Sequence, residues 1–213
     1  MFRKIFFSLV LVFLAAKAPV ASATTIGTTG SATTAIGYFG TGGFSAFGES
    51  LKSPGGMLTS LTFSSIDLYS GANARLVIAS LTGTVPGAAL YSSQYTLVNG
   101  SNTFSNLNVS TTAGLNYFAY LTVDGVTSNA VKYASFGALT PGTNYSNGSF
   151  YYGDTDCKSI QQFAEFAKYD LAFSATFATP AVAVTPEPSS LMLLATGLMS
   201  TGTMLRRRKN AAV

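Results

Sequence analysis

The chain has 213 residues, of which 47% are hydrophobic and 9% are charged, and its formal net charge at pH 7 is +4. It contains no histidine, which excludes Ser-His-Asp and Cys-His catalysis and removes the commonest metal ligand. Its single cysteine, Cys157, cannot form an internal disulfide. Without a histidine partner, this thiol is better explained as a small buried residue than as a nucleophile.

The first 23 residues have the pattern of a secretory signal peptide. Arg3 and Lys4 form a basic start, residues 5–16 form an apolar run, and Ala21-Ser22-Ala23 supplies the small residues of a cleavage site. We expect signal peptidase to cut after Ala23. An uncleaved membrane anchor is the alternative, but the apolar run is short for a membrane span.

Residues 24–179 are expected to form one exported domain, because their length suits a single core and their composition is rich in Ser, Thr and Gly but poor in charge. Residues 24–56 contain apolar side chains among many glycines, so we expect only an edge strand and loops there. Period-two alternation then predicts strands at residues 58–69, 74–81, 88–98 and 103–109.

The clearest alternation runs from Leu115 to Val123, where every second residue is apolar or aromatic. Asp124-Gly125 follows as a hairpin-type turn, so residues 126–136 are expected to return as the partner strand. Together with a last strand at residues 169–177, this pattern predicts an all-β fold, a single β-sandwich or jelly-roll-like domain.

Three tyrosines, Tyr145, Tyr151 and Tyr152, lie among Asn, Gly and Ser residues before the last strand. Aromatic rings beside amides and hydroxyls can stack on sugars and bind their hydroxyl groups, which makes this segment a candidate carbohydrate surface. Ordinary packing of strand tyrosines is the competing explanation, and we favour it.

Asp154 and Asp156 form the closest pair of acids in the sequence. Carboxylate oxygens suit Ca²⁺, but no full calcium-loop spacing follows the pair. Two carboxylates could also hydrolyse a glycoside without histidine. A solvated loop remains the favoured interpretation, so we expect no metal, no cofactor and no enzymatic activity.

A short helix is expected before the last strand. Ile160, Phe163, Ala164 and Ala167 fall at helical spacing, and Ser159 with Gln162 can form a capping box.

The C-terminal 28 residues have a three-part order. Pro186-Glu187-Pro188 ends a linker at residues 180–188, residues 189–205 form an almost uncharged stretch, and residues 206–213 begin with the cations Arg206, Arg207, Arg208 and Lys209. Seventeen helical residues reach about 26 Å, the lower limit for a membrane span. Basic residues behind a span stay in the cytoplasm and stop transfer. A buried core helix is the alternative.

These three parts, together with the leader, resemble PEP-CTERM proteins of Gram-negative bacteria. The resemblance implies that an exosortase recognises Pro186, Glu187 and Pro188 and removes the anchor, after an inner-membrane intermediate, to release the protein to the cell surface or matrix. Short segments at residues 48–63, 86–91, 114–117 and 170–173 also resemble β-sandwich domains found beside such tails. The usual tryptophan before the last strand is missing here.

Removal of both ends would leave five basic and seven acidic residues, a net charge of −2. The basic character of the whole chain therefore resides in its targeting segments, and we expect no binding to nucleic acid. The favoured function is a non-enzymatic structural or adhesive role in a polysaccharide-rich envelope or biofilm. The alternatives are a carbohydrate-binding module exported by the same route and, less favoured, a carboxylate-dependent glycoside hydrolase.

Overall fold

The computed structural model describes residues 22–28, 32, 34–68, 71–139, 145–153, 163–165, 168–179 and 196–198. Residues Ser22–Pro180 form one compact unit, and the two ends of the chain, Met1–Ala21 and Ala181–Val213, form a second. Of the second unit, a helical turn at residues 196–198 is described. In the described part of the chain, no helix has both the length and the apolar character that a membrane crossing needs. Residues 1–21 of the expected signal peptide and the rest of the expected span lie outside the described residues, whereas Ala23, the last residue of that expected peptide, begins the first strand.

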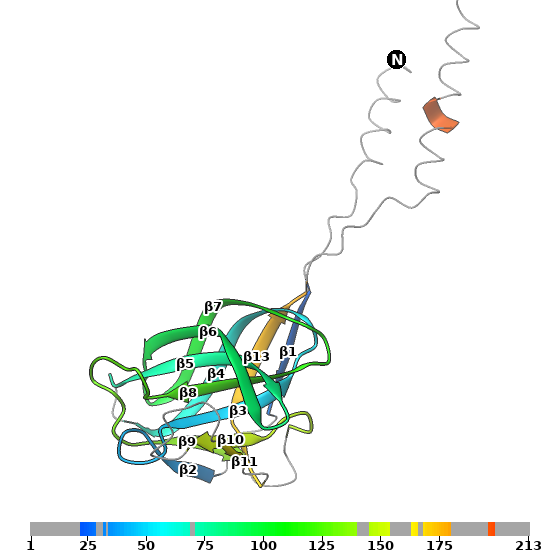
Figure 1. Cartoon of the computed structure of the whole chain (residues 1–213). Coiled ribbons are helices and arrows are strands. Elements are labelled where there is room, and N and C mark those ends of the chain that lie inside the picture. The colour runs from blue at the N-terminus through cyan, green and yellow to red at the C-terminus, as the bar shows by residue number, and fades with distance from the viewer. Residues whose placement is uncertain are drawn as a thin grey trace, which may run out of the picture. The chain divides into compact units, whose positions relative to one another are not determined.

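The domain consists of two antiparallel sheets that face each other (Figure 1). The seven-stranded sheet has the order β1-β13-β4-β9-β12, with β2 also paired to β9 and β7 also paired to β4. Its strands are β1 (Ala23–Gly27), β2 (Thr34–Phe39), β4 (Gly56–Leu68), β7 (Gly100–Thr111), β9 (Ala134–Leu139), β12 (Asp170–Leu171) and β13 (Phe173–Ala178).

The six-stranded sheet has the order β11-β10-β3-β8-β5-β6. Its strands are β3 (Ala46–Lys52), β5 (Asn73–Thr82), β6 (Val85–Thr96), β8 (Asn116–Thr122), β10 (Phe150–Gly153) and β11 (Phe163–Glu165). The all-β class expected from the alternating sequence is therefore confirmed.

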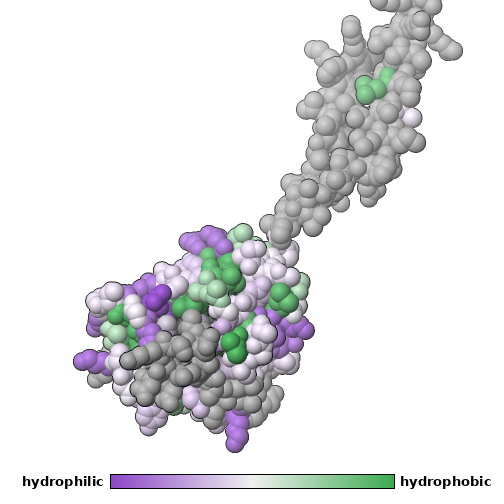
Figure 2. Space-filling view, in the orientation of Figure 1, coloured by the Kyte–Doolittle hydropathy of each residue, from purple (hydrophilic) through white to green (hydrophobic). Residues whose placement is uncertain are grey.

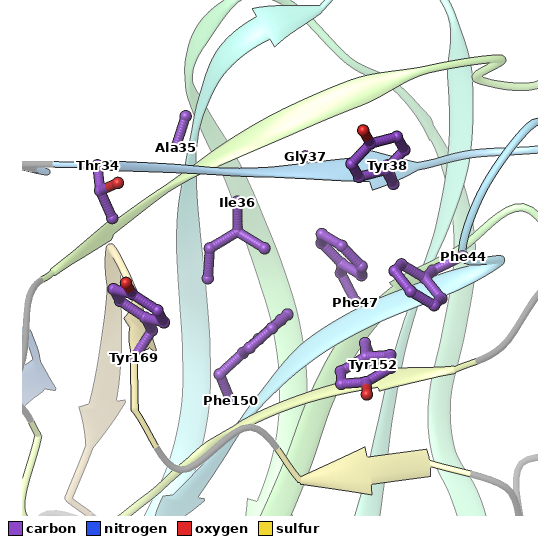
Figure 3. Close-up of a pocket in the computed structure, with 10 residues that line it drawn as sticks. All are labelled: Thr34, Ala35, Ile36, Gly37, Tyr38, Phe44, Phe47, Phe150, Tyr152 and Tyr169. Atoms are coloured by element: carbon purple, nitrogen blue, oxygen red, sulfur yellow. The ribbon is translucent and has the colours of Figure 1, made fainter.

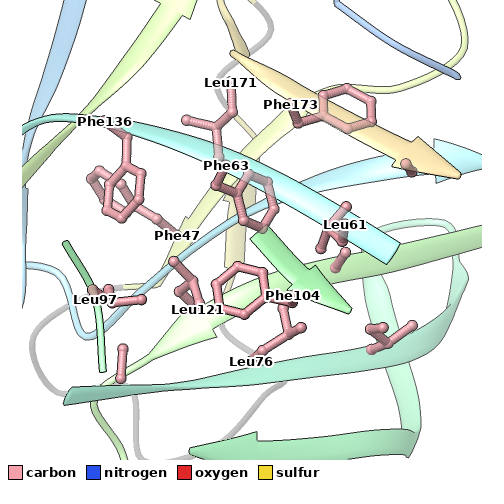
Figure 4. Close-up of a cluster of buried hydrophobic side chains, with 14 of the residues drawn as sticks. Phe47, Leu61, Phe63, Leu76, Leu97, Phe104, Leu121, Phe136, Leu171 and Phe173 are labelled. Carbon is pink, nitrogen blue, oxygen red and sulfur yellow. The ribbon is translucent and has the colours of Figure 1, made fainter. Parts of the chain in front are cut away.

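The main core lies between the sheets, where side chains of both point toward one another (Figure 4). Alternation explains the contribution of each strand, because every second side chain of a strand faces the same way. In β8, Tyr117, Ala119 and Leu121 face the core as expected, and each is at most 5% exposed. Leu115, at the start of the predicted strand, is 55% exposed.

A second cluster of buried side chains lies apart from the main core, on the opposite face of the six-stranded sheet. It contains Phe118, Tyr120 and Tyr151 with two smaller residues. The Phe118 and Tyr120 rings stack 4.8 Å apart, and Tyr151 meets Phe118 edge-on at 5.4 Å. Gly48 of β3 lies opposite Tyr120 and Tyr151 in the two neighbouring strands. This sheet is thus buried on both faces at its centre.

The structure corrects the expected β-hairpin after β8. The chain does turn at Asp124-Gly125, where Gly125 has φ +70° and the amide of Val126 donates to the carbonyl of Val123. The next strand, β9, then joins the other sheet and pairs with β2, β4 and β12. Fully buried Val131 anchors this crossover, and its amide donates to the carbonyl of Asn73.

The predicted short helix is wrong at Phe163–Glu165, which form strand β11 against β10. A strand edge supplies hydrogen-bond partners that outweigh a weak helical pattern. Residues 159–162 and 166–167, the remainder of the predicted helix, lie outside the described residues.

Residues 24–56 are also more regular than the sequence indicated. They form three strands, and β3 is central to its sheet, with β10 and β8 on its two sides.

Candidate functional site

An aromatic hollow of about 340 Å³ lies between β2 of one sheet and β3 and β10 of the other. In Figure 3, Ile36 of β2 points toward Phe47 and Phe150, and Tyr169 lies at one end of the hollow with Phe44 and Tyr152 at the other. The lining residues are Thr34, Ala35, Ile36, Gly37, Tyr38, Phe44, Phe47, Phe150, Tyr152 and Tyr169. None of these is charged, so the hollow suits an apolar or ring-shaped group.

Close ring contacts hold the wall of this hollow in place. Phe44 lies 4.6 Å from Tyr152, between ring centroids, and Phe47 meets Phe150 edge-on at 5.1 Å. Such tilted and edge-on pairs add a small stabilisation beyond the burial of area. The hollow is therefore built into the packing of the sandwich and is not a feature of its loops alone.

Tyr38 stands at the rim of the hollow in an unusual backbone conformation. Its φ is +74°, it lies within a register shift between Ile36 and Phe39, and its side chain is 64% exposed. The amide of Phe44 donates to the Tyr38 carbonyl at 2.6 Å. Gly43 permits this tight loop, because a Cβ there would lie 2.0 Å from the same oxygen. A bulky residue with positive φ is strained, and such strain often marks a functional position.

Tyr133 lies beside Tyr38 and extends the aromatic rim. The face of the domain shown in Figure 2 is mostly pale, with separate green and purple areas. The two rings meet edge-on at 5.7 Å, and Tyr133 is 43% exposed. The side chain of Tyr133 passes close over Gly37, where an added Cβ would lie 2.8 Å from its hydroxyl oxygen. Sequence reasoning missed both Tyr38 and Tyr133, although the Gly-Tyr-Phe-Gly run at residues 37–40 could have marked a backbone irregularity.

The three tyrosines expected to form a carbohydrate surface do not share one exposed surface. Tyr151 and Tyr152 are neighbours on β10 and face opposite sides of the sheet, and Tyr151 is 6% exposed within the second buried cluster. Tyr145 packs edge-on against Phe173 at 5.3 Å and donates through its hydroxyl to the carbonyl of Lys52. Of the three, Tyr152 lines the hollow.

Two acidic residues that sequence reasoning did not single out meet inside the domain. Glu49 of β3 is completely buried, and its Oε2 accepts a hydrogen bond of 3.0 Å from the amide of Leu171 in β12. Asp170 is 3% exposed, and its Oδ2 accepts a bond of 2.6 Å from the amide of Tyr145. The two carboxyl groups lie close enough for each to act on the pKa of the other. This pair links the two sheets.

Burial raises the pKa of Glu49 well above its ordinary value of 4.5; the Leu171 amide opposes the rise, and the charge and hydrogen bond of Asp170 add to it. Burial also raises the pKa of Asp170, against the effects of the Tyr145 amide and of the bond from Glu49. Both carboxyls therefore favour protonation, and the shorter amide bond to Asp170 leaves Glu49 as the protonated partner.

Apart from Ala23 at the start of β1, the remaining expected site residues lie outside the described residues. These are the calcium candidates Asp154 and Asp156, the sorting motif Pro186, Glu187 and Pro188, and the cations Arg206, Arg207, Arg208 and Lys209. Within the part of the chain that the structure describes, no three acidic or cysteine side chains gather into a metal site.

The fold and the C-terminal pattern together define an exported β protein that carries a sorting signal. Residues 184–209 match the family model of the PEP-CTERM protein-sorting motif. The resemblance inferred from Pro186-Glu187-Pro188 and the basic cluster is thereby confirmed, and the motif implies export to the cell envelope or surface and processing by an exosortase.

Comparison with solved structures finds distant likenesses. The cysteine protease and lectin-like domains of Cwp84, a surface layer associated protein of Clostridium difficile, align at 12% identity and a TM-score of 0.49 over 76% of this chain and 37% of theirs. A second structure of this clostridial cysteine protease, after propeptide cleavage, aligns at 12% identity and a TM-score of 0.48 over 74% of this chain and 40% of its own. The chain thus spans about two fifths of these structures. No curated protein matches it.

Proposed function

We propose that this protein is a non-enzymatic component of the surface or extracellular matrix of a Gram-negative bacterium, with a structural or adhesive role in a polysaccharide-rich envelope or biofilm. The observation that carries the proposal is the sorting motif at residues 184–209. The low charge of the domain and its two-sheet architecture suit a protein that works outside the cell.

Sorting proceeds in three steps under this proposal. Signal peptidase removes residues 1–23, residues 189–205 hold the protein in the inner membrane, and the exosortase then separates the domain from residues 206–213. Two prolines around Glu187 keep the recognition segment out of regular helix or sheet, and therefore accessible to an enzyme at the membrane surface.

The test is expression of the full chain in a host that carries an exosortase, with cell fractionation and mass spectrometry of C-terminal peptides. The wild type is expected outside the cell without residues 206–213. A Pro186→Ala/Pro188→Ala variant is expected to stay in the inner membrane with its tail intact, whereas the control Pro180→Ala, in the linker outside the motif, is sorted normally. Recovery of residues 206–213 from secreted wild-type protein would contradict the proposal.

The absence of histidine from the sequence supports a non-enzymatic role. The acid pair Glu49 and Asp170 adds support, because it is sealed in the domain interior away from substrates. The competing hydrolase would use Asp154 and Asp156. Polysaccharide cleavage by the purified protein that disappears in the Asp154→Asn/Asp156→Asn variant would establish the hydrolase and refute this part of the proposal.

A carbohydrate-binding module is the second candidate function. It is favoured by the aromatic hollow beside the exposed rings of Tyr38 and Tyr133, since rings with hydroxyl groups can stack on sugars. Pull-down with extracellular polysaccharide should weaken at least several-fold in Tyr38→Ala and Tyr152→Ala. The control Leu90→Ala removes an exposed apolar side chain from β6, at the far edge of the six-stranded sheet. Equal binding by all three variants would rule out this surface.

A further inference from the structure

One carboxyl oxygen of the acid pair Glu49 and Asp170 is buried without a hydrogen-bond donor. Glu49 Oε1 is buried and meets no hydrogen-bond donor, while Oε2 of the same carboxyl is paired with the Leu171 amide. A buried carboxylate oxygen without a donor is costly, because it loses its water without replacement. The cost disappears if Oε1 is itself a donor, as the hydroxyl of a protonated carboxyl group.

The carboxylate of Asp170 can accept a hydrogen bond from that proton. The carboxyl group of Asp170 acts directly on the pKa of Glu49, and one of its oxygens accepts a hydrogen bond from the Tyr145 amide. We propose that one proton, carried on Glu49 and donated to the carboxylate of Asp170, fastens β12 of one sheet onto β3 of the other and forms a pH-sensitive clasp in the sandwich.

The position of the clasp gives it a structural consequence. β12 is two residues long and pairs with β9, and one residue further on the chain enters β13, the last strand of the domain. Beyond pairing with β9, β12 is held by the hydrogen bond between Leu171 and Glu49, by the hydrogen bond from the Tyr145 amide to Asp170, and by the buried side chain of Leu171. Loss of the shared proton would place two negative charges side by side without water, so β12 and the chain leading into β13 should loosen first.

Two described groups act on Glu49 through their charge. They are Asp170 from β12 and Tyr145 from the segment before β10. Neither is a cation. The main influence on Glu49 is burial itself, which favours the neutral acid.

The direction of the pH effect follows from proton binding. The folded protein holds the proton to a higher pH than the unfolded chain, where glutamate has its ordinary pKa of 4.5. The stabilisation is therefore complete below about pH 4.5 and declines as the pH rises through the pKa of the folded pair. For a difference of one bound proton, the melting temperature of a domain of this size should fall by about 3–5 °C per pH unit in that window.

The first measurement observes the proton directly. The chain contains three glutamates, Glu49, Glu165 and Glu187, so the full-length protein labelled with ¹³C at the glutamate carboxyl carbon gives three resonances. The Glu49 signal is expected to titrate at a higher pH than the other two. Assignment by Glu165→Gln and Glu187→Gln avoids any need to alter the core. A Glu49 signal that titrates together with the others would overturn the proposal.

The second measurement follows thermal unfolding of the full-length protein in detergent from pH 5 to pH 9. Glu49→Gln keeps an acceptor for the Leu171 amide and a donor for Asp170, so it should remove the decline in melting temperature and leave the variant more stable than the wild type at pH 8. The control Asp67→Asn removes an exposed acid of β4 and should keep the wild-type slope. An unchanged slope in Glu49→Gln would refute the clasp.

Both measurements are repeated with Ca²⁺ and with a chelator, because two carboxylates could hold a cation in place of a proton. The proposal expects no difference between these conditions. A melting temperature that rises with Ca²⁺ in the wild type but not in Glu49→Gln would replace the shared proton with a metal site.

Discussion

Replacement of Gly48 by alanine should destabilise the domain through a collision at the centre of the six-stranded sheet. A Cβ at Gly48 would lie 2.3 Å from the Cβ of Tyr120, 2.6 Å from the carbonyl oxygen of Ala119 and 2.8 Å from the ring of Phe118. The first two atoms cannot move by a change of rotamer. The strands themselves must separate, so relief of the collision requires a shift of the ladder between β3 and β8.

The expected cost can be worked from two opposing effects. One extra methyl group in a packed interior costs about 1–3 kcal/mol, and the rigid neighbours place Gly48→Ala in the upper half of that range. Alanine also lowers the conformational entropy of the unfolded chain, which stabilises the folded domain by about 0.4–1 kcal/mol. The net loss is therefore about 1–2.6 kcal/mol, or roughly 2–10 °C in melting temperature for a domain of this size.

The assay is thermal unfolding of the full-length protein, monitored by circular dichroism. The control variant replaces a glycine of β2. Gly37→Ala meets the hydroxyl oxygen of Tyr133 at 2.8 Å, but this is the far end of an exposed side chain and can swing away. We expect Gly37→Ala to stay within about 0.5 kcal/mol of the wild type. Equal losses of melting temperature in Gly48→Ala and Gly37→Ala would show that the second buried cluster does not depend on the close approach of the strands at Gly48.

Two further substitutions probe the core and its hydrogen bonds by urea unfolding. Phe47→Ala removes a ring that is 2% exposed and packed against three other buried phenylalanines, so the free energy of unfolding should fall by about 3–5 kcal/mol. The control Phe47→Leu should lose less. Similar losses in the two variants would argue against tight packing around Phe47. Ser53→Ala removes a hydroxyl that donates to Thr111 at 2.7 Å and accepts from the Gly55 amide at 2.9 Å, at a cost of about 1–3 kcal/mol. The control Thr62→Val breaks an exposed hydroxyl pair and should cost under about 0.5 kcal/mol. Equal losses in Ser53→Ala and Thr62→Val would show that burial is not the reason for the cost at Ser53.

The fold class and most strands could be predicted because alternation in this chain is strong where one face is buried. The predicted strand at residues 115–123 and its inward-facing residues agree closely with β8. The crossover after Asp124-Gly125 could not be predicted, because a turn dipeptide fixes local direction and not which sheet the chain joins next. Strand β11 was missed because a short pattern compatible with a helix was overridden by pairing with β10.

The site was predictable only in part, for two physical reasons. The sorting motif could be predicted because it acts as a linear signal whose parts are neighbours in sequence. The clasp could not be predicted, since Glu49 and Asp170 are 121 residues apart and a charged residue in a strand normally indicates a solvent-facing position. Tyr38, at the rim of the hollow, has a left-handed backbone, which is uncommon for a bulky residue and could not be expected from its type.

The antiparallel pairing of β1 with β13 bears on the timing of export. Thr24 in the first strand lies opposite Phe177 in the last, and the amide of Thr28 donates to the carbonyl of Phe173. The outermost ladder of the seven-stranded sheet therefore cannot close until nearly the whole domain has been translocated. Because the sorting motif begins at residue 184, completion of the native sheet and arrival of the sorting signal at the membrane become almost the same event.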